Sequence, residues 1–161
     1  MDIREFAQEF QDNIKMAVEM GNTDYDTEIA KGILEYMEDN GEVNAPEICA
    51  FQKTRTRVTA YDYNDEAESL DLFYLVKSDT LLGKVNNNKV QQGFNYLMSF
   101  YREAMNGTLL RSVSIENTDE IAEVAKLVQS TKGSRRALKN ADGRSLFFMA
   151  NITFFTVFCY I

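Results

Sequence analysis

The sequence contains no histidine, no tryptophan, a single proline and only two cysteines, Cys49 and Cys159. Without histidine, the Ser-His-Asp and Cys-His catalytic arrangements are excluded, and so are zinc sites with histidine ligands. Two cysteines are too few for a four-cysteine zinc site. Both lie in apolar stretches, which favours buried free thiols in a reducing compartment. We therefore expect a cytoplasmic protein.

Basic residues are fewer than acidic ones: the chain has 17 Lys and Arg and 25 Asp and Glu, which gives a formal net charge of -8. Nucleic-acid affinity comes largely from Lys and Arg that neutralise phosphates, so we expect nucleic-acid binding by the whole surface to be weak. One loop departs from this pattern and could contact phosphates, although a solvated turn is the simpler interpretation. Its basic residues are Lys132, Arg135, Arg136, Lys139 and Arg144.

What the chain does have is hydrophobic periodicity of two kinds. Within the first 130 residues, apolar residues recur at helical spacing near both ends. In the stretch between these two regions, apolar and polar residues alternate as in a β-strand. The pattern predicts helices over 2–20, 24–39, 87–106 and 118–130, and strands near 48–53, 55–64, 69–77 and 145–161. This order predicts one α/β (α+β) domain over 1–161, with a central mixed β-sheet that contains a hairpin at 55–77 and is flanked by helices.

The segment 145–161 is almost wholly apolar. A membrane span needs about 20 apolar residues, and Asn151 interrupts this shorter run. Its Phe, Ile, Thr and Val content favours strands, so we expect one or two buried strands rather than a membrane segment.

The predicted hairpin carries the residues most suited to chemistry. If Asp65–Glu68 forms the turn, Asn64 pairs with Ser69 and Asp62 lies directly opposite Asp71. Cross-strand partners share one face of a sheet, and two carboxylates held together repel unless they are protonated, paired or bound to a metal. Asp62 and Asp71 are therefore candidate catalytic residues and candidate ligands for a divalent metal such as Mg²⁺. An edge hairpin with water-facing aspartates, or a register shifted by one residue, would remove this site.

The first part of the chain resembles the N-terminal domain of AIPR (abortive infection phage resistance) proteins of bacteria. The resemblance covers about residues 1–130. It rests on the segments MDIREFAQEF, ILEYMEDNGEV, APEICAFQK, RVTAYDYNDEAESLDLFYLV and KVQQGFNYLMSFYREAMNG. The tail after Gly143 does not follow the usual continuation of the family, which suggests a truncated reading frame or an excerpt of a longer protein.

The resemblance implies a restriction-endonuclease-like fold of the PD-(D/E)xK type. Nucleases of this fold carry an aspartate on one strand and an acidic-x-Lys triplet on the next. Carried over, Asp62 matches the first aspartate and Asp71 the second acidic residue, but Phe73 occupies the lysine position. Phenylalanine cannot orient water or stabilise negative charge, so a nuclease here would need another cation, such as Lys53 or Arg57.

Three functions remain open at this point. The first is a non-catalytic or degenerate nuclease-like domain of a phage-defence protein that acts as an interaction or regulatory module. The second is a Mg²⁺-dependent nuclease that uses Asp62 and Asp71. The third is a structural or oligomerisation module. The sequence names no certain cofactor, and it leaves open a protein partner or self-association.

Overall fold

The computed structural model describes residues 2–21, 23–77, 86–111, 118–131, 138–139, 145–146 and 152–159. The described helices are α1 (Ile3–Gly21), α2 (Tyr25–Asp39), α3 (Asn87–Met105), the short η1 (Leu109–Arg111) and α4 (Thr118–Ser130). The described strands are β1 (Glu47–Lys53), β2 (Thr56–Asn64), β3 (Ser69–Lys77), β4 (Leu138–Lys139), β5 (Ser145–Leu146) and β6 (Ile152–Cys159). The four predicted helices and the first three predicted strands are confirmed, each with bounds within one residue of those expected.

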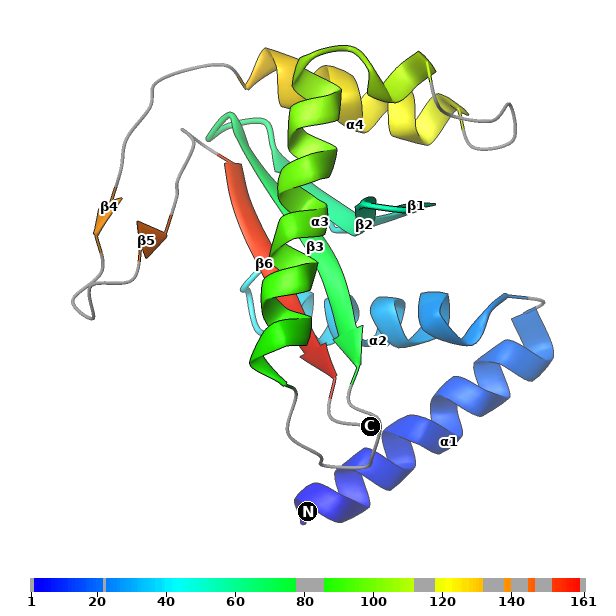
Figure 1. Cartoon of the computed structure of the whole chain (residues 1–161). Coiled ribbons are helices and arrows are strands. Elements are labelled where there is room, and N and C mark those ends of the chain that lie inside the picture. The colour runs from blue at the N-terminus through cyan, green and yellow to red at the C-terminus, as the bar shows by residue number, and fades with distance from the viewer. Residues whose placement is uncertain are drawn as a thin grey trace.

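Four of the strands form one sheet in the order β1-β2-β3-β6 (Figure 1). The β1/β2 and β2/β3 pairs are antiparallel, whereas β3 and β6 run parallel. The predicted mixed sheet is therefore confirmed, and β3 is an interior strand as its apolar sequence indicated. The tail contributes β6, which pairs with β3 from Leu70↔Ile152 to Lys77↔Cys159.

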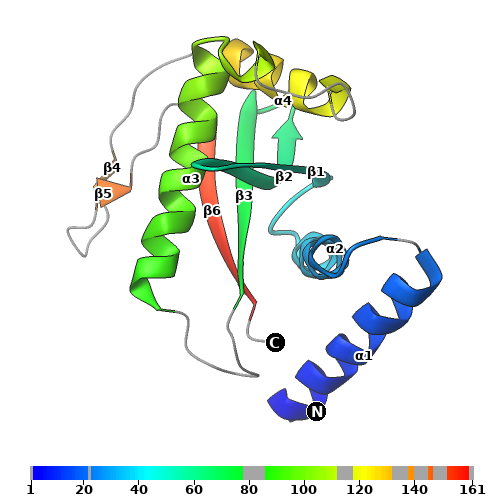
Figure 2. The ribbon, with the colours of Figure 1, turned by 45° about the vertical axis from the view of Figure 1, so that its right-hand side comes forward.

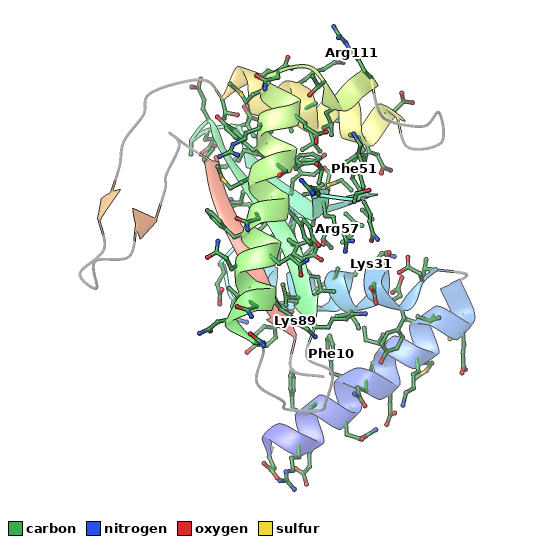
Figure 3. The ribbon with its side chains drawn as sticks, viewed as in Figure 1. Phe10, Lys31, Phe51, Arg57, Lys89 and Arg111 are labelled. Atoms are coloured by element: carbon green, nitrogen blue, oxygen red, sulfur yellow. The ribbon has the colours of Figure 1, made fainter. Side chains whose placement is uncertain are left out.

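Helices cover both faces of this sheet because its side chains alternate between two apolar faces. Leu70 and Leu72 of β3 lie in a buried cluster with residues of α3 and α4, whereas Phe73 packs with Leu34 of α2. Figure 2 shows α3 on one side of β3 and β6 and α2 on the other. Helix α1 lies outside α2, and its Phe10 packs against the cluster that joins the two helices (Figure 3).

A glycine sets how closely α3 approaches β3. A Cβ atom placed on Gly93 would lie 2.8 Å from Cδ1 of Tyr74 and 3.1 Å from Cγ2 of Val76. The first distance is shorter than real Cβ contacts and the second is tighter than most of them, so a larger residue would require the helix or the Tyr74 side chain to shift. Gly93 thereby holds its neighbours on the same helix, Gln92 and Tyr96, beside β3.

Several further expectations have different outcomes. Cys49 is a free, buried thiol whose pKa is raised by burial. The predictions for Cys159, for the side chains of the basic loop and for the burial of the tail fall on side chains that lie outside the described part of the structure. None of the helices in the described part of the chain is long and apolar enough to cross a membrane. The single-domain assignment over 1–161 stays a prediction.

Candidate functional site

The predicted pairing of the hairpin is confirmed residue by residue. Asn64 pairs with Ser69 and Asp62 with Asp71. The turn between the strands is closed locally, because the backbone N–H of Ala67 donates to Oδ1 of Asn64 over 2.8 Å. The two aspartates therefore occupy facing positions on the side of the sheet that α2 covers, which is the side of Phe73.

Among the residues that the structure describes, Asp62 is the only acidic residue that is buried, with 3% of its surface exposed. Its Oδ2 accepts the backbone N–H of Asn44 over 2.8 Å, and its Oδ1 accepts the backbone N–H of Ala45 over 3.2 Å. Hydrogen bonds to an ionised acceptor are the stronger kind, and they offset the cost of burying the charge. Asp62 therefore holds the segment between α2 and β1 against the hairpin, and each of its carboxylate oxygens accepts one hydrogen bond.

The position that would carry the nuclease lysine belongs to the core. Phe73 is 1% exposed and lies in a buried cluster with Leu34, Val43 and Ala60. Asp71 is half-buried. No group of three or more His, Cys, Asp or Glu residues within the described ranges is arranged to hold a metal ion. The assignment of Asp62 and Asp71 as catalytic or metal-binding residues stays a prediction.

A different feature arises where β2 and β3 separate. Their recorded pairing runs from Asn64↔Ser69 to Ala60↔Phe73, after which β3 continues alongside β6 while β2 continues alongside β1. The divergence removes ladder hydrogen bonds, and the backbone N–H of Leu75 instead donates to Oγ1 of Thr59 over 3.0 Å. The gap opened by this divergence is walled by side chains of neighbouring elements, and we call it the β2–β3 cleft.

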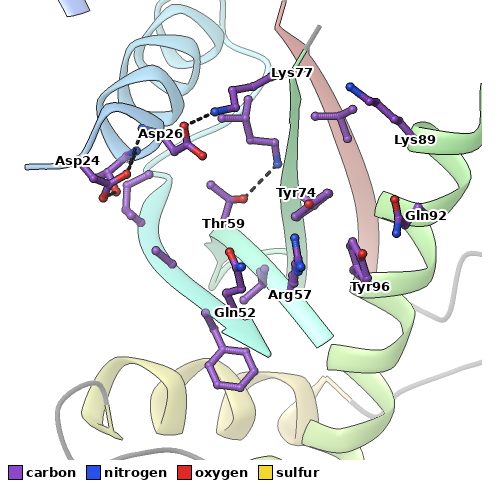
Figure 4. Close-up of a pocket in the computed structure, with 17 residues that line it drawn as sticks. Asp24, Asp26, Gln52, Arg57, Thr59, Tyr74, Lys77, Lys89, Gln92 and Tyr96 are labelled. Carbon is purple, nitrogen blue, oxygen red and sulfur yellow. Dashed lines mark hydrogen bonds and ion pairs between the residues drawn. The ribbon is translucent and has the colours of Figure 1, made fainter. Parts of the chain in front are cut away.

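The β2–β3 cleft is a cavity of about 510 Å³ lined by residues of α2, β1, β2, β3 and α3. Its charged lining residues are Asp24, Asp26, Arg57, Lys77 and Lys89. Figure 4 shows the two aspartates of α2 on one side, Lys89 on α3 on the other, and Arg57 between them. Neither hairpin aspartate belongs to the described lining.

The two acidic residues that line the cleft, Asp24 and Asp26, both interact with other residues of the chain. Asp24 is the N-cap of α2, and its Oδ1 accepts the backbone N–H groups of Asp26 and Thr27, each over 3.0 Å. The hydroxyl of Thr27 also donates to Asp24, and this hydrogen bond is the main reason why the pKa of Asp24 is lowered. Asp26 forms an ion pair with Lys77.

The basic side of the cleft centres on Arg57. Its guanidinium carbon lies 4.6 Å from the centroid of the Tyr96 ring, and Tyr96 meets the edge of Tyr74 with ring centroids 5.5 Å apart. Its Nε is buried and has no hydrogen-bond partner among the described residues. The contact with the Tyr96 ring holds the guanidinium in place at the wall of the cleft.

Sequence reasoning mentioned Arg57 and Lys53 only as substitutes for a missing lysine. Lys53 instead pairs with Glu103 of α3, with 3.7 Å between Nζ and Oε2. Arg57 lines the cleft together with Lys77 and Lys89, and the sequence pattern did not predict that these three residues come together. The only signal available was a basic residue on a strand of an acidic protein, which by itself is compatible with ordinary surface exposure.

Comparison with known families identifies a match over most of the chain. The abortive infection phage resistance protein N-terminal domain matches residues 29–140, which is more than half of the chain. Neither a curated protein nor a solved structure matches. The match supports the family suggested by the sequence, and the restriction-endonuclease-like relationship stays a prediction.

Proposed function

Since the chain belongs to the abortive infection phage resistance protein family, we propose that it is the non-catalytic, nuclease-like N-terminal domain of a cytoplasmic phage-defence protein. In this proposal the domain acts as an interaction or regulatory module. Cleavage of nucleic acid, where the defence requires it, is then performed by another component.

The observation that carries this proposal is the state of Asp62. In a metal-dependent phosphodiesterase the two strand carboxylates would present oxygens to the metal, which activates water and neutralises the charge that develops on phosphate. The Asp62 oxygens accept backbone N–H groups of Asn44 and Ala45 instead, and the residue is 3% exposed. Binding a metal through Asp62 would require breaking these contacts and exposing the segment that they hold.

The surroundings of Asp71 support the same conclusion. The side chain two positions further along β3 is the buried Phe73, and the cations Arg57 and Lys77 line a cleft whose described lining excludes both hairpin aspartates. A cation that stabilises the transition state must lie close to the reacting phosphate. The absence of both hairpin aspartates from the lining of that cleft supports a non-catalytic role.

The test is a cleavage assay on the purified protein with plasmid, single-stranded DNA and RNA, each in the presence of Mg²⁺ or Mn²⁺. We expect no cleavage above that of a mock purification. Asp71→Asn is the decisive variant because Asp71 is less buried than Asp62 and its replacement should leave the fold intact. Cleavage by the wild-type protein that disappears in a folded Asp71→Asn variant would contradict the proposal.

The second candidate function, a Mg²⁺-dependent nuclease, is favoured by one specific observation, the confirmed pairing of Asp62 with Asp71. Mg²⁺ is often held by only one or two protein carboxylates, with water and substrate phosphates completing its shell. If this function operates, Mg²⁺ should raise the melting temperature of the wild-type protein but not that of Asp71→Asn. Asp65→Asn, which alters an exposed aspartate of the same hairpin, is the matched control.

A further inference from the structure

The net negative charge of the chain is concentrated in its first two helices. Residues 2–39, which contain α1 and α2, include 11 Asp and Glu but only 3 Lys and Arg, so their net charge of -8 equals that of the whole chain. Residues 40–161 contain as many basic as acidic residues. Figure 2 shows α1 and α2 together on the side of the sheet away from α3. This layer therefore attracts basic molecules and repels anionic ones.

Exposed apolar side chains gather on the same two helices. The large hydrophobic side chains that are exposed in the described part of the chain are Phe6, Met16, Met20, Tyr25 and Tyr36. All of them belong to α1 or α2. A single exposed apolar residue is ordinary, whereas several on one layer indicate a surface that another molecule covers. Charge and apolar surface therefore coincide on one layer of the molecule.

A groove of about 450 Å³ opens between α1 and α2, and we call it the α1–α2 groove. Its lining includes Phe6, Phe10 and Tyr36, which we call the aromatic cluster. The centroid of the Phe6 ring lies 6.3 Å from that of Phe10 and 6.3 Å from that of Tyr36. Phe6 is 47% exposed and Tyr36 is 58% exposed, so the cluster is open to solvent. Aromatic side chains are the residues most enriched as anchors of protein interfaces.

The close packing of α1 on α2 depends on Gly32. A Cβ atom placed on Gly32 would lie 2.9 Å from Cε2 of Phe10 and 3.4 Å from Cδ1 of Ile14. The Phe10 ring therefore rests against α2 at a position where a side chain would displace it. This approach brings Phe6 of α1 beside Tyr36 of α2 and forms the aromatic wall of the groove.

Acidic side chains of α2 line the same groove. They are Glu28, Glu35 and Asp39, and Lys31 is the only basic residue in the described lining. Lys31 already forms an ion pair with Glu28, with 2.7 Å between Nζ and Oε1. Glu35 and Asp39 are exposed and belong to none of the ion pairs in the described part of the chain. The groove thus combines an apolar wall with two carboxylates that await a cation.

We propose that the α1–α2 groove binds a basic amphipathic helix of a partner protein, with its apolar side chains on the aromatic cluster and its Lys or Arg side chains on Glu35 and Asp39. The inference rests on the proposed role as an interaction module, and it names the surface and the chemistry of the partner. A helix fits because its side chains pack into the space between two other helices. An extended peptide would need an open sheet edge for its backbone hydrogen bonds, whereas both walls of this groove are helices.

Charge distinguishes this partner from other occupants of the groove. The same layer of a second copy also carries a net charge of -8, so like charges oppose the pairing of two grooves. Nucleic acids and anionic membrane surfaces are repelled for the same reason. A basic partner is instead steered toward the groove by the field of the layer.

Fluorescence anisotropy tests the groove with a labelled model peptide of Leu and Lys, about 14 residues or roughly four helical turns long. Its leucines recur at i, i+3, i+4 and i+7, so that they share one face. We expect the purified protein to bind it with a dissociation constant below about 100 μM. A peptide of the same composition in scrambled order, which has no apolar face, should bind at least about tenfold more weakly. A peptide of Leu and Glu in the original pattern should not bind.

The aromatic wall is tested by a matched pair of tyrosine variants. Tyr36→Ala should weaken binding of the Leu and Lys peptide at least about fivefold, because it removes an anchor of the interface. Tyr25→Ala removes an exposed tyrosine of the same helix outside the described lining, and it should change the affinity less than about twofold. Phe6→Ala is the second aromatic variant if Tyr36→Ala does not fold, and thermal denaturation shows whether each variant is folded.

The acidic wall is tested by two double variants. Glu35→Gln with Asp39→Asn removes two charges from the groove and should weaken binding at least about threefold. Glu38→Gln with Glu42→Gln removes two exposed charges nearby but outside the described lining, and it should change the affinity less than about twofold. Equal losses in the two double variants would show attraction to the acidic layer in general and would overturn the proposal.

The proposal is also overturned if the dissociation constant of the Leu and Lys peptide exceeds about 100 μM, if the scrambled peptide binds as tightly, or if Tyr25→Ala loses as much affinity as Tyr36→Ala. A dimer seen in sedimentation that Tyr36→Ala dissociates would make a second copy the occupant and would overturn it as well. Asp71→Asn should bind the peptide as the wild-type protein does. Cleavage that depends on Asp71 would therefore contradict the non-catalytic assignment without changing this result, and a failure of peptide binding would leave that assignment intact.

Discussion

Replacing Asp62 by asparagine removes one negative oxygen while keeping the size of the side chain. The N–H groups of Asn44 and Ala45 donate to different oxygens of Asp62, and an asparagine keeps only one of these as an acceptor, so one of the two N–H groups loses its partner. The NH2 group of the asparagine then faces a backbone N–H donor in a place where Asp62 is 3% exposed. The substitution therefore loses one bond to a charged acceptor and leaves a donor facing a donor.

The magnitude follows from these two losses. A hydrogen bond to a charged group contributes about 1.5–3 kcal/mol, and a buried unsatisfied donor costs about 1–3 kcal/mol. Because exposure of the neighbouring loop relieves part of the second cost, we expect Asp62→Asn to lower the free energy of unfolding by about 2–4 kcal/mol. Amide hydrogen exchange at Asn44 and Ala45 should accelerate more than exchange at core residues of β3.

Urea denaturation measures this change as a shift in the midpoint at constant slope. Asp65→Asn is the matched control, because it makes the same chemical change at an exposed turn position of the same hairpin. It should stay within about 0.5 kcal/mol of the wild-type protein. If Asp62→Asn also stays within that limit, Asp62 does not anchor the loop, and the argument that its oxygens are unavailable to a metal fails.

Two further predictions concern the fold around the site. Leu72→Ala should lower the free energy of unfolding by about 2–5 kcal/mol, since Leu72 is fully buried on an interior strand, and a change below about 0.5 kcal/mol in urea denaturation would contradict that placement. Asp24→Ala should lower the free energy of unfolding by about 1 kcal/mol at pH 7, because the N-cap of α2 is lost. Because the pKa of Asp24 is lowered in the folded state, the stabilisation is fully present above the unfolded pKa of about 4 and is lost as the pH falls through the folded value, so the difference between the variants should shrink in acid. If the difference in the free energy of unfolding between the wild-type protein and Asp24→Ala grows below about pH 4, the predicted direction of the pH dependence is wrong.

The sequence predicted the elements well because their signals are local. Helical spacing and strand alternation depend on neighbours a few residues apart, and the polar turn Asp65–Glu68 fixed the hairpin register, including Asp62 opposite Asp71. The role of Asp62 was not predictable in the same way. Its partners are backbone N–H groups of Asn44 and Ala45, and every residue other than proline offers such a group, so no residue type marks them.

The β2–β3 cleft was not predictable either, because it depends on where two paired strands separate. Arg57, Lys77 and Lys89 come from three elements, and they line one cleft only when β3 stays with β6 while β2 follows β1. The close approach of α3 at Gly93 then completes the wall. Neither the divergence nor the approach leaves a periodic signal in the chain.

The most direct test of the non-catalytic assignment is a phage-plating assay in cells whose resistance to phage depends on this protein. The efficiency of plating is compared between the wild-type protein, Asp71→Asn and the control Asp65→Asn, with protein levels matched by immunoblot. Our account predicts equal protection by all three, because Asp71 performs no chemistry. Loss of protection in Asp71→Asn alone, at an unchanged protein level, would contradict it and would assign the hairpin aspartates a catalytic role.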